Sequence, residues 1–197
     1  MDSETLVAGP AGALETRLTR PEAPSGGTAL LCHPHPQYGG NMNDAVLDVL
    51  ARELLARGVT VARFNFRGVG RSEGRYDGQG GEAGDVRAML DWLEAEHGPD
   101  APILGGYSFG AAMAWQACQA GATPSRVLLI APPVGMMPFE GAPLDCPVAV
   151  FAGDQDEFID AEVLARWRGP EISIIQGANH FFSGRWDQLG AAIRSQI

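Results

Sequence analysis

The stretch Gly105-Gly106-Tyr107-Ser108-Phe109-Gly110 decides how the rest of the sequence is interpreted, because it predicts a serine on a strand-to-helix turn. Residues 101–104 before it are apolar, as in a buried parallel strand, and residues 111–118 after it are rich in helix formers. Glycines on either side of Ser108 keep side chains out of the tight turn. The Phe109 N–H and the positive end of the helix then point to where an oxyanion would form. The stretch therefore predicts that Ser108 is a nucleophile.

Length and charge limit the classes of protein to consider. A chain of 197 residues is long enough for a full core, so we expect a single domain spanning residues 1–197. A net charge of −10 argues against binding to nucleic acid or to an anionic membrane. A local basic cluster lies in a glycine-rich segment with acidic neighbours, and we interpret it as a solvated loop. Its members are Arg63, Arg67, Arg71 and Arg75.

The three cysteines, Cys32, Cys118 and Cys146, are widely separated in the sequence and form no C-x-x-C pair. They predict neither a zinc site nor a disulfide framework, and they fit buried thiols in a reducing compartment. The first residues are acidic, and no stretch of the sequence is apolar enough to be a signal peptide or a membrane span. We therefore expect a cytoplasmic protein.

The order of expected elements predicts an α/β fold. A hairpin over residues 5–8 and 13–18 comes first, and strands then alternate with helices. Asn41 or Asn43 is expected to cap the first helix, which Gly58 closes, and Gly84-Asp85 is expected to start the second. This alternation predicts a mostly parallel, twisted sheet with helices on both faces and a ligand site at the carboxyl ends of its strands. The remaining expected strands cover residues 28–32, 59–66, 126–131, 147–152 and 172–175, and the remaining helices residues 160–167 and 183–196.

A nucleophilic serine needs a base to take its proton and an acid to hold that base. His180 follows the last expected strand and is the candidate base. Asp154, Asp156 and Glu157 follow the strand before it. We favour Asp156 as the acid and interpret Asp154 as a turn or cap residue.

These segments together resemble the small lidless bacterial α/β-hydrolases, a group of serine hydrolases and esterases whose first turn has the sequence H-P-H-P. The resemblance covers nearly the whole chain, and it implies an α/β-hydrolase fold without a cap domain and a triad of Ser108, Asp156 and His180. In this chain the first turn lacks the glycine that is usual in the superfamily. Because proline has no N–H, the resemblance implies that the oxyanion is held by the N–H groups of Phe109 and of His35 or Gln37. The matching segments are residues 33–40, 63–74, 106–110, 153–156 and 177–182.

The two histidines of the H-P-H-P turn raise the question of a metal. His33 and His35 have no cysteine or carboxylate nearby in sequence to complete a ligand set. We therefore expect no metal and no cofactor, and a structural role for a ring that hydrogen-bonds backbone groups of the proline-rich turn.

The short segment Pro132–Cys146 stands where lidded relatives insert a cap, so we expect a shallow open pocket and short-chain carboxylic esters as small-molecule substrates. A peptidase or amidase with the same triad and a non-catalytic binding protein remain alternatives, and acyl transfer to alcohol or peroxide is a possible side activity. The sequence does not determine the oligomeric state. The expected pocket residues are Tyr38, Met42, Tyr107, Met136, Met137, Phe139, Phe158 and Phe182.

Overall fold

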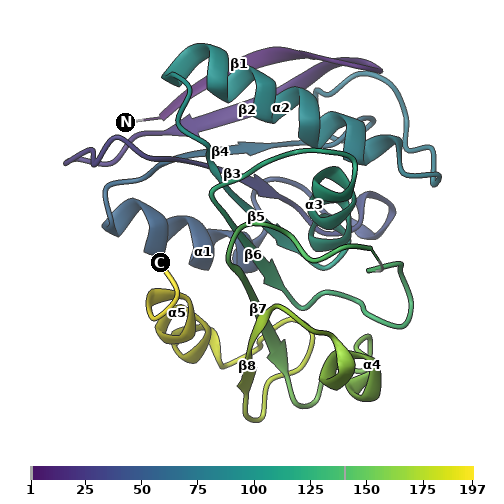
Figure 1. Ribbon diagram of the computed structural model, residues 1–197. Helices are drawn as coiled ribbons and strands as arrows, with labels where there is room; N and C mark the ends of the chain where they lie inside the picture. Colours follow the sequence, from purple (N-terminus) through teal and green to yellow (C-terminus); the bar gives the residue numbers. More distant parts are fainter. Residues whose placement is uncertain (1, 140) are drawn as a thin grey trace.

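The computed structural model describes residues 2–139 and 141–197 and contains an eight-stranded sheet in the order β1-β2-β4-β3-β5-β6-β7-β8 (Figure 1). The hairpin of β1 (Asp2–Gly9) and β2 (Gly12–Thr19) is antiparallel and joins β4 (Thr60–Phe64) in antiparallel register. All other pairings are parallel, which confirms the predicted mostly parallel sheet. The other strands are β3 (Thr28–Cys32), β5 (Ile103–Tyr107), β6 (Arg126–Ile130), β7 (Val148–Gly153) and β8 (Glu171–Ile175).

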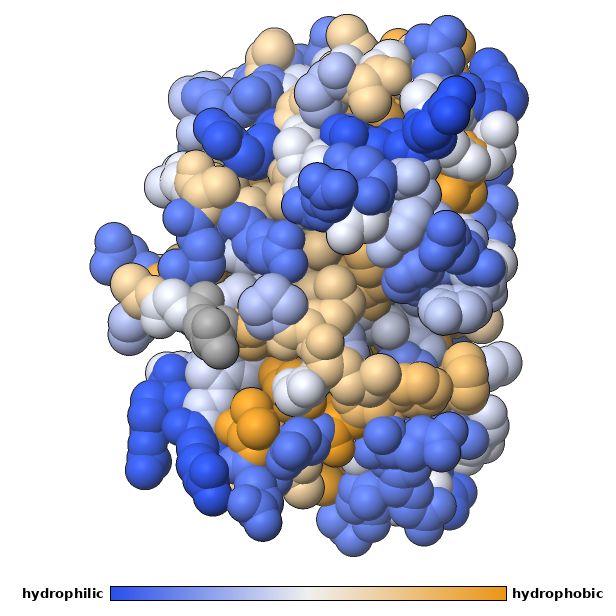
Figure 2. Space-filling view, turned by 90° about the vertical axis from the view of Figure 1, so that its right-hand side faces the viewer, coloured by the Kyte–Doolittle hydropathy of each residue, from blue (hydrophilic) through white to orange (hydrophobic). Residues whose placement is uncertain are grey.

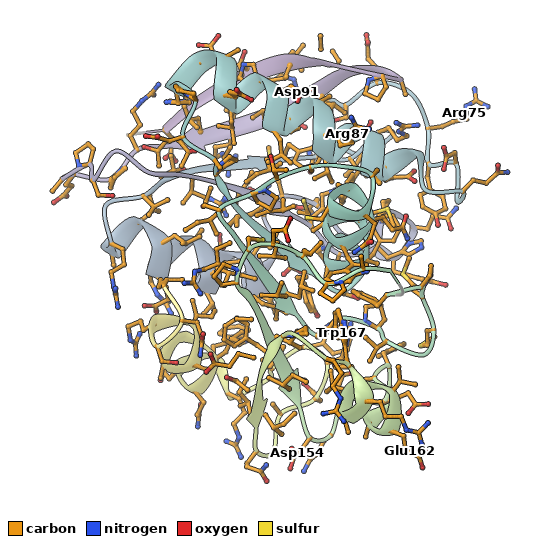
Figure 3. All side chains as sticks on the ribbon, in the orientation of Figure 1. Arg75, Arg87, Asp91, Asp154, Glu162 and Trp167 are labelled. Carbon is orange, nitrogen blue, oxygen red and sulfur yellow. The ribbon has the colours of Figure 1, made fainter. Side chains whose placement is uncertain are left out.

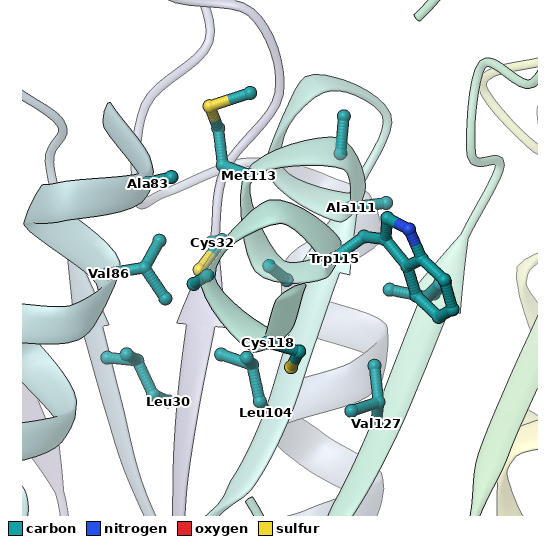
Figure 4. Close-up of a cluster of buried hydrophobic side chains, with 14 of the residues drawn as sticks. Leu30, Cys32, Ala83, Val86, Leu104, Ala111, Met113, Trp115, Cys118 and Val127 are labelled. Carbon is teal, nitrogen blue, oxygen red and sulfur yellow. The ribbon is translucent and has the colours of Figure 1, made fainter. Parts of the chain in front are cut away.

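Helices cover both faces of the sheet, and each face has its own cluster of buried apolar side chains. Helices α1 (Ala45–Ala56) and α5 (Trp186–Arg194) pack together on one face, and Figure 1 shows them side by side. The opposite face is covered by α2 (Gly81–His97), α3 (Phe109–Gln119) and α4 (Ala161–Arg166). Helix α3 presses its small residues onto β3, β5 and β6, and Figure 4 shows Cys32 and Cys118 in this packing.

The two expected helix starts were misplaced. Asp44 caps α1, because its Oδ1 accepts hydrogen bonds from the N–H groups of Val46 (2.8 Å) and Leu47 (3.3 Å). Asn41 lies one turn earlier and accepts instead from the Asn43 N–H. Helix α2 begins at Gly81, before the expected start at Gly84-Asp85.

Asp85 has a tertiary partner that local sequence did not reveal. Its carboxylate is fully buried and accepts from Arg67 Nε (2.9 Å) and Nη2 (2.7 Å) in a bidentate ion pair. The hydrogen bonds that Arg67 donates to this carboxylate raise the pKa of Arg67. The interpretation of the arginine cluster as a solvated loop is therefore wrong for Arg67, whose partner lies on α2, and for Arg63, which lies in β4 and pairs with Asp48 of α1.

All three cysteines are free; Cys32 and Cys118 are buried and Cys146 is half-buried. Burial raises the pKa of Cys118 to about 12.

In the described part of residues 131–147, the chain between β6 and β7 forms turns without a helix or strand, in agreement with the expected absence of a cap. The helices of the described residues are all too short or too polar to cross a bilayer.

Candidate active site

Ser108 lies between β5 and α3 with φ 54° and ψ −117°, a backbone conformation that side-chain-bearing residues rarely adopt. The turn is tight because a Cβ on Gly106 would lie 2.4 Å from the Gly110 O. Its other side is equally close, since a Cβ on Gly110 would lie 2.2 Å from the Cys32 O. The two glycines flanking Ser108 thus have the steric role expected of them.

Ser108, His180 and Asp156 form a chain of hydrogen bonds. The Ser108 Oγ lies 2.9 Å from His180 Nε2, and His180 Nδ1 lies 2.8 Å from Asp156 Oδ2. The His180 and Asp156 side chains are buried, whereas Ser108 is half-buried. Asp156 also accepts the Phe158 N–H through Oδ1 (2.9 Å), which fixes the carboxylate. The structure therefore brings together the three residues expected to form the triad, from the turns after β5, β7 and β8.

Asp154, the alternative acid, lies outside this chain of hydrogen bonds. Its side chain is exposed at the lower edge of the molecule (Figure 3). Its Oδ1 accepts the Gly177 N–H at 2.6 Å, so it joins the turns that follow β7 and β8. This is the turn role expected for Asp154.

His180 is held by its neighbours as well as by Asp156. The Tyr107 Oη donates a hydrogen bond to the His180 main-chain O at 3.1 Å. Phe158 and Phe181 pack their rings near the imidazole, with centroids 4.6 Å and 5.5 Å away. Phe181 was not among the expected site residues, although its position next to His180 in the sequence is the signal that could have found it.

The H-P-H-P turn is fixed by the ring of His33, which is fully buried. His33 Nδ1 lies 2.6 Å from the Pro34 O, and its Nε2 accepts the Phe66 N–H at 3.0 Å. Burial lowers the pKa of His33 to about 4, so the ring is neutral at pH 7, with its proton on Nδ1. This is the structural role expected for a histidine of the turn.

The main-chain N–H groups expected to hold the oxyanion differ in whether they already donate a hydrogen bond. Phe109 is the first residue of α3, so its N–H has no acceptor within the helix. The Gln37 N–H donates to His35 Nδ1 at 3.2 Å. Because Pro34 and Pro36 have no N–H, His35 offers the remaining main-chain donor of this turn.

The expected pocket residues do not share one place. Tyr107 and Phe182 are buried in the core, which corrects the expectation that they line a pocket. Tyr38 is exposed, Met42 borders a polar cavity of about 510 Å³ and Phe158 flanks His180. Met136, Met137 and Phe139 line an apolar cavity of about 560 Å³ together with Val163 and Trp167. Figure 2 shows the side of the molecule that lies on the right in Figure 1, and hydrophobic residues gather in its lower half.

The described residues contain no group of three histidine, cysteine, aspartate or glutamate side chains placed to hold a metal ion. The carboxyl edge of the sheet carries a serine hydroxyl bonded to a histidine, which is bonded in turn to a buried carboxylate.

Comparison with known proteins agrees with the fold. A model of the alpha/beta hydrolase family matches residues 29–196, and the chain belongs to this family. It is similar to an alpha-beta serine hydrolase homologue from Coxiella burnetii, with 36% identity and a TM-score of 0.92 over 99% of this chain and 97% of the other. It is also similar to an a/b serine hydrolase without lid from Xanthomonas campestris, with 34% identity and a TM-score of 0.92 over 98% and 92% of the two chains.

A relative from Rickettsia prowazekii, an uncharacterized protein, is 35% identical over 205 residues, which cover 96% of this chain and 86% of the relative. The family and the two serine hydrolase homologues support a hydrolase. The Xanthomonas campestris protein has no lid, and the described residues between β6 and β7 of this chain form only turns.

Proposed function

We propose that this protein is a serine hydrolase that cleaves short-chain carboxylic esters through Ser108, His180 and Asp156. The observation that carries the proposal is the chain of hydrogen bonds from the Ser108 Oγ through His180 (2.9 Å) to Asp156 (2.8 Å). A hydroxyl bonded to an imidazole, which is oriented by a buried carboxylate, is the arrangement that activates serine for acyl transfer.

In the first half-reaction, His180 Nε2 takes the proton of Ser108 as the Oγ attacks the ester carbonyl. Asp156 holds Nδ1–H of the imidazole and stabilises the imidazolium that forms. The negative charge that develops on the carbonyl oxygen is held by the N–H groups of Phe109 and His35. His180 then returns the proton to the departing alcohol, leaving an acyl group on Ser108.

In the second half-reaction, water replaces the alcohol. His180 takes a proton from the water as it attacks the acyl carbonyl, and the same two N–H groups hold the oxyanion. Collapse of the intermediate releases the carboxylic acid, and His180 returns the proton to Ser108. The residues return to their starting protonation states, and no cofactor takes part in these steps.

Short esters are proposed because the described residues between β6 and β7 form only turns and place no cap over this edge of the sheet. We further propose that a small acyl or alcohol group enters the apolar cavity of about 560 Å³ lined by Met136, Met137 and Phe139, whose lining does not include the triad residues. The net charge of −10 disfavours anionic substrates. The free thiols fit a reducing compartment, and we propose the cytoplasm as the location.

The test is hydrolysis of p-nitrophenyl esters, from acetate to palmitate, by the wild type and by Ser108→Ala. We expect the wild type to prefer the short esters and Ser108→Ala to lose on the order of 10⁴-fold or more in kcat. Circular dichroism must show that the variant is folded. Activity that survives the substitution would exclude Ser108 as the nucleophile.

The two candidate acids provide a matched pair. Asp156→Asn should lower kcat by on the order of 10⁴-fold, because the amide cannot hold His180 in the required tautomer. Asp154→Asn makes the same chemical change at an exposed carboxylate that does not contact His180 and should keep wild-type activity. Similar losses in both variants would contradict the assignment of the acid.

The same triad can cleave amides, so a matched pair of ester and anilide substrates distinguishes an esterase from an amidase. Ligand binding seen by thermal shift without turnover of either substrate would instead indicate a binding protein.

A further inference from the structure

The imidazole of His35 joins two segments of the chain that are distant in sequence. Its Nδ1 accepts the Gln37 N–H at 3.2 Å, so the neutral ring carries its proton on Nε2. Nε2 lies 3.2 Å from the Oη of Tyr76, within the segment between β4 and α2. Nε2–H therefore donates to the Tyr76 hydroxyl.

The ring of Tyr76 is packed beside the start of α3. Its centroid lies 5.0 Å from that of His35 and 5.9 Å from that of Phe109, and the His35 and Phe109 rings are 4.9 Å apart. The three aromatic rings thus form one cluster next to the Phe109 and His35 N–H groups, the two donors proposed to hold the oxyanion.

The His35 main-chain O accepts hydrogen bonds only from within its own turn, among the residues that the structure describes. The Tyr38 and Gly40 N–H groups both donate to the His35 O at 3.1 Å. These bonds shape the turn but do not attach it to the rest of the molecule. The His33 ring joins the start of the turn to Phe66, and the hydrogen bond to Tyr76 is a second connection, made at His35 itself. Its loss would let His35 shift relative to α3.

We propose that Tyr76 is a positioning residue: its hydroxyl holds the His35 imidazole and thereby places the His35 main-chain N–H where the oxyanion forms. The inference rests on the proposed function for its effect on catalysis. Tyr76 acts through the His35 imidazole and touches none of the reacting atoms. Because the oxyanion exists only after the serine attacks, a displaced donor weakens transition-state binding and leaves substrate binding nearly unchanged.

The variant Tyr76→Phe removes the hydroxyl and keeps the ring that packs against His35 and Phe109. We expect kcat for a p-nitrophenyl ester to fall about tenfold and KM to change less than about twofold, since loss of a whole oxyanion donor costs about 10²- to 10³-fold. A larger KM with an unchanged kcat would overturn the proposal and would indicate that Tyr76 binds substrate directly.

A double-mutant cycle with His35→Ala tests whether Tyr76 acts through the imidazole. In the His35→Ala background, Tyr76→Phe should change kcat by less than about twofold, because the hydrogen bond is already gone. Independent, multiplicative losses would contradict the proposal. Arg75→Gln is the control for disturbing the loop, since the Arg75 side chain points away from the molecule (Figure 3), and it should retain wild-type kcat and KM.

Nuclear magnetic resonance decides the positioning role without relying on turnover. The wild type should show the proton of His35 on Nε2, and Tyr76→Phe should speed solvent exchange of this Nε2–H by about tenfold, because its acceptor is gone. A proton on Nδ1, or an unchanged exchange rate, would overturn the inference even in an active enzyme. If the wild type hydrolyses no ester but these signals are as expected, the proposed function fails while the positioning of His35 by Tyr76 stands.

Discussion

Ser108 combines a reactive hydroxyl with a backbone conformation that its own side chain disfavours, at φ 54°. A strained conformation of this kind costs about 1–3 kcal/mol, and glycine adopts positive φ without that cost. We expect Ser108→Gly to be more stable than Ser108→Ala by about 1 kcal/mol in urea unfolding, with both variants inactive. Equal stabilities would show that the turn relaxes once the hydroxyl is removed.

His33 should make the stability of the protein depend on pH. Its folded-state pKa of about 4 lies below the ordinary value of 6.5, so the unfolded chain takes up a proton first as the pH falls. The folded state therefore loses stability from about pH 6.5 down to pH 4, by a total of about 3 kcal/mol from this residue.

The variant His33→Gln tests this dependence, because its side-chain oxygen can still accept the Phe66 N–H while the group no longer titrates. The difference in unfolding free energy between wild type and variant should shrink by about 3 kcal/mol from pH 7 to pH 4. A difference that stays constant over this range would mean that His33 does not titrate between the two states. The carboxylates that also titrate here are common to both proteins and cancel in the comparison.

At the scale of elements, the site depends on how closely the start of α3 approaches the end of β3. Gly110 makes this contact, since a Cβ there would lie 2.2 Å from the Cys32 O and 2.6 Å from the His33 O. The contact brings the H-P-H-P turn next to the Ser108 turn and so sets the distance between the two proposed oxyanion donors.

We expect Gly110→Ala to separate these elements, lowering the unfolding free energy by about 2 kcal/mol and kcat by at least about tenfold. The control is Gly27→Ala, because a Cβ on Gly27 meets only a Val59 methyl group at 3.8 Å. Urea unfolding and ester hydrolysis measure both effects. A fully active Gly110→Ala protein would contradict the role given to this close approach.

At the scale of the whole molecule, the site lies at the carboxyl edge of the sheet with only turns between β6 and β7 in the part of residues 131–147 that the structure describes. Without a cap to displace, the rate on a sparingly soluble short ester should follow the concentration of dissolved substrate and level off at the solubility limit. A sharp rise in rate once an ester–water interface forms would contradict this and would indicate a segment that moves at the interface.

Much of this architecture could be predicted because periodic apolar segments record which residues are buried. The alternation of strands and helices, the glycines around Ser108 and the order of serine, acid and histidine were all visible along the chain. Capping was harder to place, because Asn41, Asn43 and Asp44 are all good caps and the choice depends on where the chain turns.

By itself, the sequence determined the class of fold and the residue types available at the strand ends, since both follow from local patterns. Tertiary structure alone decided which polar groups meet. It placed Arg67 against Asp85, chose Asp156 rather than Asp154 as the partner of His180, and joined His35 to Tyr76. The physical reason is that hydrogen bonds act over about 3 Å, whereas these partners are separated by many residues, so only the packed sheet and helices bring them within reach.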